Sequence, residues 1–188
     1  IEYGPGLAVE YFNEVYDEKD INLLMEAAAS LKNFAEKYNL TIEMGRFFAA
    51  TCGTYLTKVV DTKVNCGINY AICDGGMNQL KYYGQTMAMQ VPPITLVNSE
   101  DREKSHWSLC GSLCTTADVL VRKVELPHLR IGDVLAFHRS GAYSVTEGIS
   151  TFLSREIPRV YLYSENTGLS MVRDFYDLSL LNYPEEVW

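Results

Sequence analysis

The chain has 188 residues, of which 47% are hydrophobic and 21% charged, an ordinary balance for a folded globular protein. Its net charge of −8, without clusters of Lys and Arg, argues against nucleic acid as a partner. No apolar run approaches the ~18 residues that a membrane span needs, and no membrane contact is expected.

The sequence begins inside an apparent strand and turn, Ile1-Glu2-Tyr3-Gly4-Pro5-Gly6, with no basic stretch before a long apolar core. A secretory signal is therefore not expected, and the abrupt start suggests a piece of a longer protein. The cysteines are odd in number and irregularly spaced: Cys52, Cys66, Cys73, Cys110 and Cys114. We expect reduced thiols in a cytoplasmic protein rather than a disulfide framework.

Residues 1–42 predict a strand, a glycine-rich turn, a helix and a second strand. Between Asp20 and Tyr38 the apolar residues recur at three- and four-residue steps, which is the period of an amphipathic helix. Asp20 suits the N-cap of this helix, and Leu40-Thr41-Ile42 is a strand candidate. This order of elements is typical of a parallel sheet with a crossover helix.

After Arg46 the period changes, and β-branched and aromatic runs recur between turn signals. They predict strands over Thr54–Val60, Ile68–Cys73, Ile94–Val97, Asp118–Lys123, Val134–Phe137, Val160–Tyr163 and Leu169–Arg173. We predict a mainly β fold, an antiparallel barrel or sandwich over residues 46–188 that follows a β/α unit over residues 1–45. The mixed-charge run Ser99–Ser105 is interpreted as a solvated loop, and further helix is expected only at Glu147–Leu153 or in the tail.

Three short motifs could bind a ligand, and each has a purely structural alternative. The glycines of Gly4-Pro5-Gly6 would let backbone N–H groups approach a phosphate, although a plain tight turn has the same sequence. Glu43-Met44-Gly45-Arg46 offers a carboxylate for a heteroaromatic nitrogen and a guanidinium for a phosphate, or else a surface ion pair. Gly141-Ala142-Tyr143 could direct a tyrosine hydroxyl to a ligand, or simply bury a tyrosine at a strand corner.

His106, Cys110 and Cys114 follow one another at four-residue steps, which could suggest a zinc site. Structural zinc usually takes four ligands in tighter pairs, and the sequence has no second cluster. We therefore expect no metal, and a buried thiol is the default interpretation of either cysteine.

The order of the motifs carries more information than any one of them: Gly-Pro-Gly, Glu-x-Gly-Arg, Asp-Gly-Gly-Met-Asn, Gly-x-x-Cys-x-x-x-Asp, Leu-Pro-x-Leu-x-x-Gly-Asp and Gly-Ala-Tyr. This series resembles the fold-type III pyridoxal-phosphate decarboxylases, the family of diaminopimelate, ornithine and arginine decarboxylases. The resemblance extends from Gly4 to about Arg173 and is densest over Gly111–Tyr143. It implies that residues 1–45 are the last part of an α/β barrel and that residues 46–188 are a C-terminal β domain.

The resemblance also implies a site for pyridoxal 5'-phosphate. Gly4 and Gly6 match the turn that holds the cofactor phosphate, and Arg46 matches the arginine near that phosphate. Glu43 matches the carboxylate beside the pyridine nitrogen, and Tyr143 matches the tyrosine that closes on the cofactor. A protonated pyridine is the better electron sink for the carbanion left when carbon dioxide departs.

Cys114 matches the catalytic cysteine that reaches across the interface of a homodimer into the partner's site. A thiol near the substrate carbon could return a proton to it. The lysine that binds the cofactor covalently has no match in this chain, because no lysine lies in an early-barrel context. The chain alone is therefore expected to be inactive.

The sequence departs from the family pattern at positions that bear on the cofactor and the substrate. Pro5 stands in the middle of the glycine turn, and Met44 replaces a proline. Thr115 follows the interface cysteine where the family usually has an acid, and Tyr82, beside Lys81, stands where diaminopimelate decarboxylases have an arginine. Both changes remove charges that would recognise a polar end of the substrate. We therefore expect the full-length enzyme to discriminate against meso-diaminopimelate, unless Lys81 binds the distal carboxylate in place of the missing arginine.

The sequence thus predicts the C-terminal part of a pyridoxal-phosphate-dependent amino-acid decarboxylase that works as a cytoplasmic homodimer. The identity of the amino acid stays open. A related amino-acid racemase is one alternative, which the cysteine and Gly-Ala-Tyr motifs disfavour. A non-catalytic dimerising homologue is another, and retention of Glu43, Arg46, Cys114 and Tyr143 argues against it.

Overall fold

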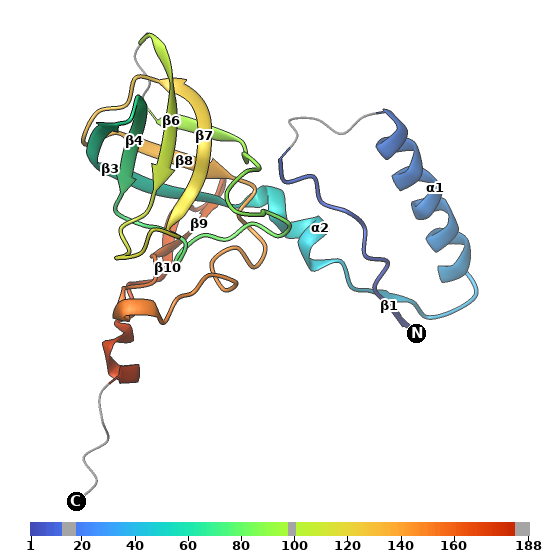
Figure 1. Ribbon diagram of the computed structural model, residues 1–188. Helices are drawn as coiled ribbons and strands as arrows, with labels where there is room; N and C mark the ends of the chain where they lie inside the picture. Colours follow the sequence, from blue (N-terminus) through green and yellow to red (C-terminus); the bar gives the residue numbers. More distant parts are fainter. Residues whose placement is uncertain (13–17, 98–100, 183–188) are drawn as a thin grey trace, which may run out of the picture.

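The computed structural model describes residues 1–12, 18–97 and 101–182 (Figure 1). Its first part contains β1 (Glu2–Tyr3), α1 (Glu18–Ala35) and β2 (Thr41–Ile42). The two strands pair in parallel, with Glu2 opposite Thr41 and Tyr3 opposite Ile42. The predicted strand, helix and parallel strand are therefore confirmed.

Helix α1 begins at Glu18, so Asp20 lies in its first turn and is not the N-cap that the sequence suggested. From Ile21 to Ala35 none of its side chains is buried, and Met25 is 67% exposed. Figure 1 shows α1 standing apart from the main sheet. Its apolar residues thus form an uncovered face on the β/α unit.

The main sheet has six strands in the order β5-β8-β3-β4-β6-β7. Their bounds are β3 (Thr54–Asn65), β4 (Ile68–Cys73), β5 (Ile94–Val97), β6 (Lys104–Cys110), β7 (Val119–Pro127) and β8 (Val134–His138). Neighbouring strands are antiparallel except β4 and β6, which are parallel. The sheet curls into an open half-barrel (Figure 1), which confirms the predicted mainly β fold.

The core lies inside the curled sheet, and the chain segment before α1 contributes to it. Strand β3 alternates buried Tyr55 and Val59 with exposed neighbours, as a strand with one covered face does. Tyr11 is 3% exposed and belongs to the same cluster of buried side chains, with Val9 and Phe12 packed against it. Residues 9–12 therefore pack with the sheet, although they lie within the expected barrel part.

Strand β6 was not predicted from the sequence. The run Ser99–Ser105 is expected to be a loop, but Lys104 and Ser105 begin β6, and residues 99 and 100 lie outside the described residues. The strand lies between β4 and β7, and Trp107 to Leu109 are buried in succession. A strand covered on both faces has no two-residue alternation, so its pattern gave no signal.

The remaining elements are short. α2 (Gly45–Ala49) and the 3₁₀ turn η1 (Ala50–Cys52) connect β2 to the sheet. The helix expected at Glu147–Leu153 is only the 3₁₀ turn η2 (Phe152–Ser154), and the tail has the turn η3 (Leu178–Asn182). Strands β9 (Val160–Ser164) and β10 (Gly168–Arg173) form a separate antiparallel hairpin. Within the described ranges, no helix has the length and apolar character to cross a membrane.

Candidate cofactor site

The ends of β1 and β2 bring the glycine turn beside Glu43. The backbone N–H of Glu43 donates to the carbonyl of Tyr3 over 3.0 Å, and a Cβ on Gly4 would lie 3.5 Å from the Glu43 carbonyl oxygen. Gly6 has φ +62°, a left-handed conformation that glycine adopts without strain, and the space around it is open. The turn and an exposed carboxylate thus meet at the carboxyl ends of two parallel strands, where ligands commonly bind.

Arg46 on α2 is the centre of a cluster of aromatic and acidic side chains. Its guanidinium forms an ion pair with Glu147 and donates a hydrogen bond of 3.3 Å to the Tyr11 hydroxyl. It also lies 4.5 Å from the ring centroid of Tyr83 and 4.7 Å from that of Tyr143. Burial lowers the pKa of Arg46, but the hydrogen bonds to Tyr11 and Glu147 outweigh it and raise the pKa overall.

Tyr143 lies in a strained turn at the same place. Its φ is +62°, and its carbonyl oxygen accepts hydrogen bonds from the backbone N–H groups of Thr146 (2.9 Å) and Glu147 (2.8 Å). A Cβ on Gly45 would lie 2.9 Å from the Tyr143 hydroxyl, so glycine at that position leaves room for the ring. The residue is 53% exposed, which contradicts the alternative of a buried corner tyrosine.

The loop that carries Cys114 is fixed by the buried carboxylate of Asp118. Its Oδ1 accepts from the backbone N–H of Met77 and its Oδ2 from that of Leu113, both over 2.8 Å. A Cβ on Gly76 or Gly111 would come within 2.4 or 2.2 Å of these oxygens. Asp118 therefore ties the loop after β4 to the loop after β6, and the two glycines let it fit.

Cys114 is exposed on this loop, and Thr115 beside it uses its hydroxyl within the loop, accepting from the backbone N–H of Ala117 over 3.2 Å. Among the described residues, no hydrogen bond or ring contact joins Cys114 to the cluster around Arg46. One chain thus places the two parts of the predicted site on different loops. The described residues contain no group of three metal-ligand side chains.

Tyr82 does not fit the expected contact with substrate. It is 1% exposed, its hydroxyl donates to the carbonyl of His138 over 2.6 Å, and its ring packs edge-on against Tyr11 and Phe12. Burial accordingly raises the pKa of its hydroxyl. The adjacent Tyr83 is 64% exposed and contacts Arg46 instead, so the tyrosine available to a ligand is one residue further along the chain.

Lys81 is half-buried and has its backbone N–H bonded to the carbonyl of Ser144 over 2.8 Å. The residue helps to line a cavity of about 230 Å³ that Arg122 and Thr116 also line. The cavity thus lies between the segment after β4 and the base of the loop that carries Cys114. Lys81 and Arg122 are the two basic residues among those that line it.

Several residues at the site were not predicted from the sequence. Asp118 is the last residue of the Gly-x-x-Cys-x-x-x-Asp motif. The glycines that lie against its carboxylate, Gly76 and Gly111, were the available signal. Tyr11 and Glu147 contact Arg46 across 35 and 101 residues of sequence, and no local pattern marks such contacts.

Comparison with known proteins identifies the class. Residues 14–141 match the family model described as the C-terminal sheet domain of pyridoxal-dependent decarboxylases. The chain is 30% identical over 178 residues to the diaminopimelate decarboxylase of Methanocaldococcus jannaschii, covering 93% of this chain and 39% of that protein. It is 28% identical to the L-glutamyl-[BtrI acyl-carrier protein] decarboxylase of Niallia circulans, covering 92% and 42%.

The crystal structure of the M. jannaschii diaminopimelate decarboxylase in complex with L-lysine superimposes with a TM-score of 0.75 at 27% identity, covering 95% of this chain and 41% of that one. Fold and matches together define the C-terminal region that pyridoxal-dependent decarboxylases have in common. The chain belongs to the pyridoxal-dependent decarboxylase family, as the ordered motifs implied. It spans about two fifths of the length of the relatives that it matches.

Proposed function

We propose that the full-length protein is a pyridoxal-phosphate-dependent amino-acid decarboxylase, to which this chain contributes cofactor-binding residues and a cysteine for the partner's active site. The observation that most supports this proposal is that the proposed cofactor-binding residues are neighbours on one surface. The glycine turn lies against Glu43, Arg46 follows three residues later, and Tyr143 packs on Arg46 and Gly45.

These residues fit the cofactor chemically. Gly4 and Gly6 leave the open backbone that a phosphate requires, and the exposed carboxylate of Glu43 can hold a proton on the pyridine nitrogen. Pyridoxal phosphate, when bound, withdraws electrons from the substrate Cα as carbon dioxide leaves. Tyr143 would cover the cofactor side of the site, and the Cys114 thiol would return a proton to the substrate carbon.

The proposal includes a homodimer, since Cys114 lies on a different loop from the Arg46 cluster and would complete the partner's site. It also includes the division into a last barrel part, residues 1–45, and a sheet domain, residues 46–188, with residues 9–12 packed on the latter. All five cysteines are free thiols, which suits a reducing compartment such as the cytoplasm.

The substrate is proposed to be an amino acid whose distal end is less charged than that of meso-diaminopimelate. Thr115 supports this, because it offers a hydroxyl already used in its own loop where the family usually has an acid. One relative, that of N. circulans, is named for a glutamyl group on a carrier protein, an amino acid with a conjugated end. Lys81 is the residue that could still bind a carboxylate.

The full-length protein, supplied with pyridoxal phosphate, tests the function. It should release carbon dioxide from an amino acid, and Glu43→Gln should lower kcat by about a hundredfold or more. Glu36→Gln, which removes an exposed carboxylate after α1, is the matched control and should leave kcat unchanged. The chain without its barrel half should show no activity and no covalent cofactor. If the full-length protein releases carbon dioxide from none of the amino acids, the proposed function is wrong. If the Glu43→Gln variant is as active as the wild type, the proposed cofactor site is wrong.

A further inference from the structure

Tyr83 is held in place by the residues on either side of it. Tyr82 is buried, and its hydroxyl donates to the carbonyl of His138 over 2.6 Å. The backbone N–H of Gln85 donates to the Tyr82 carbonyl over 3.2 Å, which closes a turn in which Gly84 has φ +80°. The backbone of Tyr83 is therefore fixed, although the residue itself is 64% exposed.

The Tyr83 ring contacts the guanidinium of Arg46, whose carbon lies 4.5 Å from the ring centroid. The ring carries no charge, so it attracts the cation without neutralising it as a carboxylate does. Of the five N–H donors of Arg46, one on Nη1 bonds to Tyr11 and one on Nη2 bonds to Glu147. Among the described residues no other acceptor bonds to this guanidinium, and its side chain is 26% exposed. The remaining donors are therefore available to an anion.

An arginine that its neighbours already hold loses less conformational freedom when it binds a phosphate. Resting on the cofactor site proposed above, we propose that Tyr83 is a positioning residue for Arg46 and thereby strengthens binding of the phosphate group of the cofactor. The aromatic ring is the part that acts, and its hydroxyl is not needed. Because Tyr83 is mostly exposed, the loss of its ring should not unfold the domain.

Two alcohols related to the cofactor test this role in the full-length protein freed of its cofactor. Pyridoxine 5'-phosphate carries the phosphate group, pyridoxine lacks it, and neither has the aldehyde that reacts with a lysine. In calorimetry, Tyr83→Leu should raise Kd for pyridoxine 5'-phosphate by about threefold to tenfold and leave Kd for pyridoxine unchanged. Tyr83→Phe, which keeps the ring, should bind both ligands as the wild type does.

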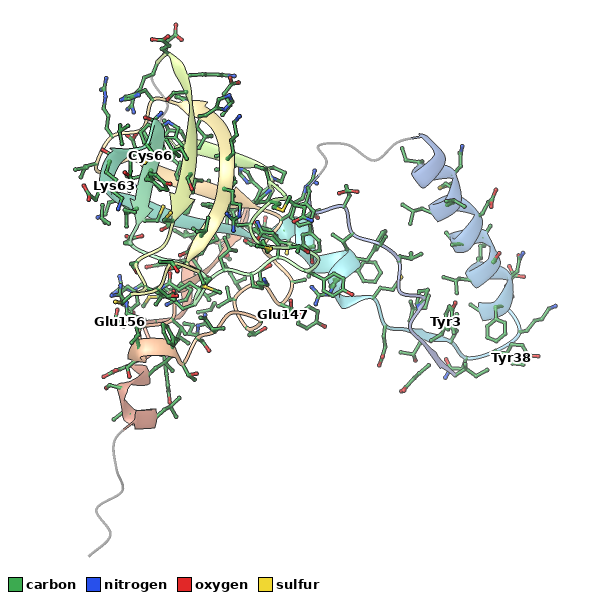
Figure 2. All side chains as sticks on the ribbon, viewed as in Figure 1. Tyr3, Tyr38, Lys63, Cys66, Glu147 and Glu156 are labelled. Carbon is green, nitrogen blue, oxygen red and sulfur yellow. The ribbon has the colours of Figure 1, made fainter. Side chains whose placement is uncertain are left out.

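Tyr70→Leu is the matched control, because the Tyr70 ring also lies against a cation, with its centroid 5.9 Å from the Nζ atom of Lys63. Figure 2 shows Lys63 well apart from Glu147, which marks the proposed site. This variant should bind both ligands as the wild type does. In an Arg46→Met background, Tyr83→Leu should change neither affinity further, because the ring acts only through the guanidinium.

The role of Tyr83 is wrong if Tyr83→Leu changes Kd for pyridoxine 5'-phosphate by less than about twofold, or if it weakens both ligands equally. It is also wrong if the wild type binds the two ligands with equal affinity, since Arg46 would then not bind the phosphate group. If the full-length enzyme releases carbon dioxide from no amino acid, the proposed decarboxylase function fails, while these affinities still decide the role of Tyr83.

Discussion

Replacing Asp118 by Asn should destabilise the sheet domain without changing its size. Asp118 is 3% exposed, and its two oxygens accept from the backbone N–H groups of Met77 and Leu113. An amide can accept from one of them only, and its NH₂ group would then face the other donor. A buried N–H group left without an acceptor costs about 1–3 kcal/mol, and loss of the carboxylate charge weakens the remaining hydrogen bond. We therefore expect Asp118→Asn to lower the free energy of unfolding by about 2–4 kcal/mol.

A loss of that size corresponds to a fall in Tm of about 5–15 °C for a domain of this length. Differential scanning calorimetry of the full-length protein measures it, with Asp101→Asn, at an exposed carboxylate, as the matched control. The loop of Cys114 depends on the same contacts, so alkylation of Cys114 should change in rate as well. An Asp118→Asn protein that melts within about 2 °C of the wild type would refute the assigned role.

Iodoacetamide at pH 8 should modify the exposed Cys114 but spare Cys73, since burial raises the pKa of Cys73 to about 12; equal labelling in peptide mass spectra would contradict this. Burial raises the pKa of Asp133, but the hydrogen bond from Arg102 outweighs burial and lowers this pKa overall. The ion pair therefore stabilises the fold above the ordinary carboxyl pKa of about 4, and this stabilisation is lost as the pH falls through the lowered pKa of Asp133. Asp133→Asn should therefore lower the urea midpoint at pH 7 but not at pH 2. Mixing Cys114→Ala with Glu43→Ala subunits should restore about a quarter of wild-type activity, because half of randomly paired dimers are mixed and each keeps one intact site. A mixture as inactive as its parents would exclude a shared site.

Local periodicity was sufficient for most of the fold. Ile68–Cys73 and Ile94–Val97 were predicted with the bounds that the structure has, because each is an apolar run between turn signals. Strand β6 could not be found this way, since Trp107, Ser108 and Leu109 are buried in succession and leave no two-residue alternation. Burial on two faces is a property of the assembled sheet and leaves no alternation in the sequence.

The site shows the same division between local and assembled properties. Gly4, Glu43 and Arg46 could be found because their motifs are short. The choice between Tyr82 and Tyr83 could not, since it depends on Tyr11 packing against one of the two rings. The pairing of Arg46 with Glu147 likewise joins residues that only the folded chain brings together.

Tyr11 has a consequence for how this protein can be divided. Its ring packs with Tyr82 in the sheet core, while its hydroxyl accepts a hydrogen bond from Arg46 at the proposed cofactor surface. The carbonyl of its neighbour Glu10 also accepts from Arg139 over 2.6 Å. The sheet domain is therefore not an interchangeable module that begins at Arg46. A chimaera that joined it to a foreign barrel would need to bring residues 9–12 along.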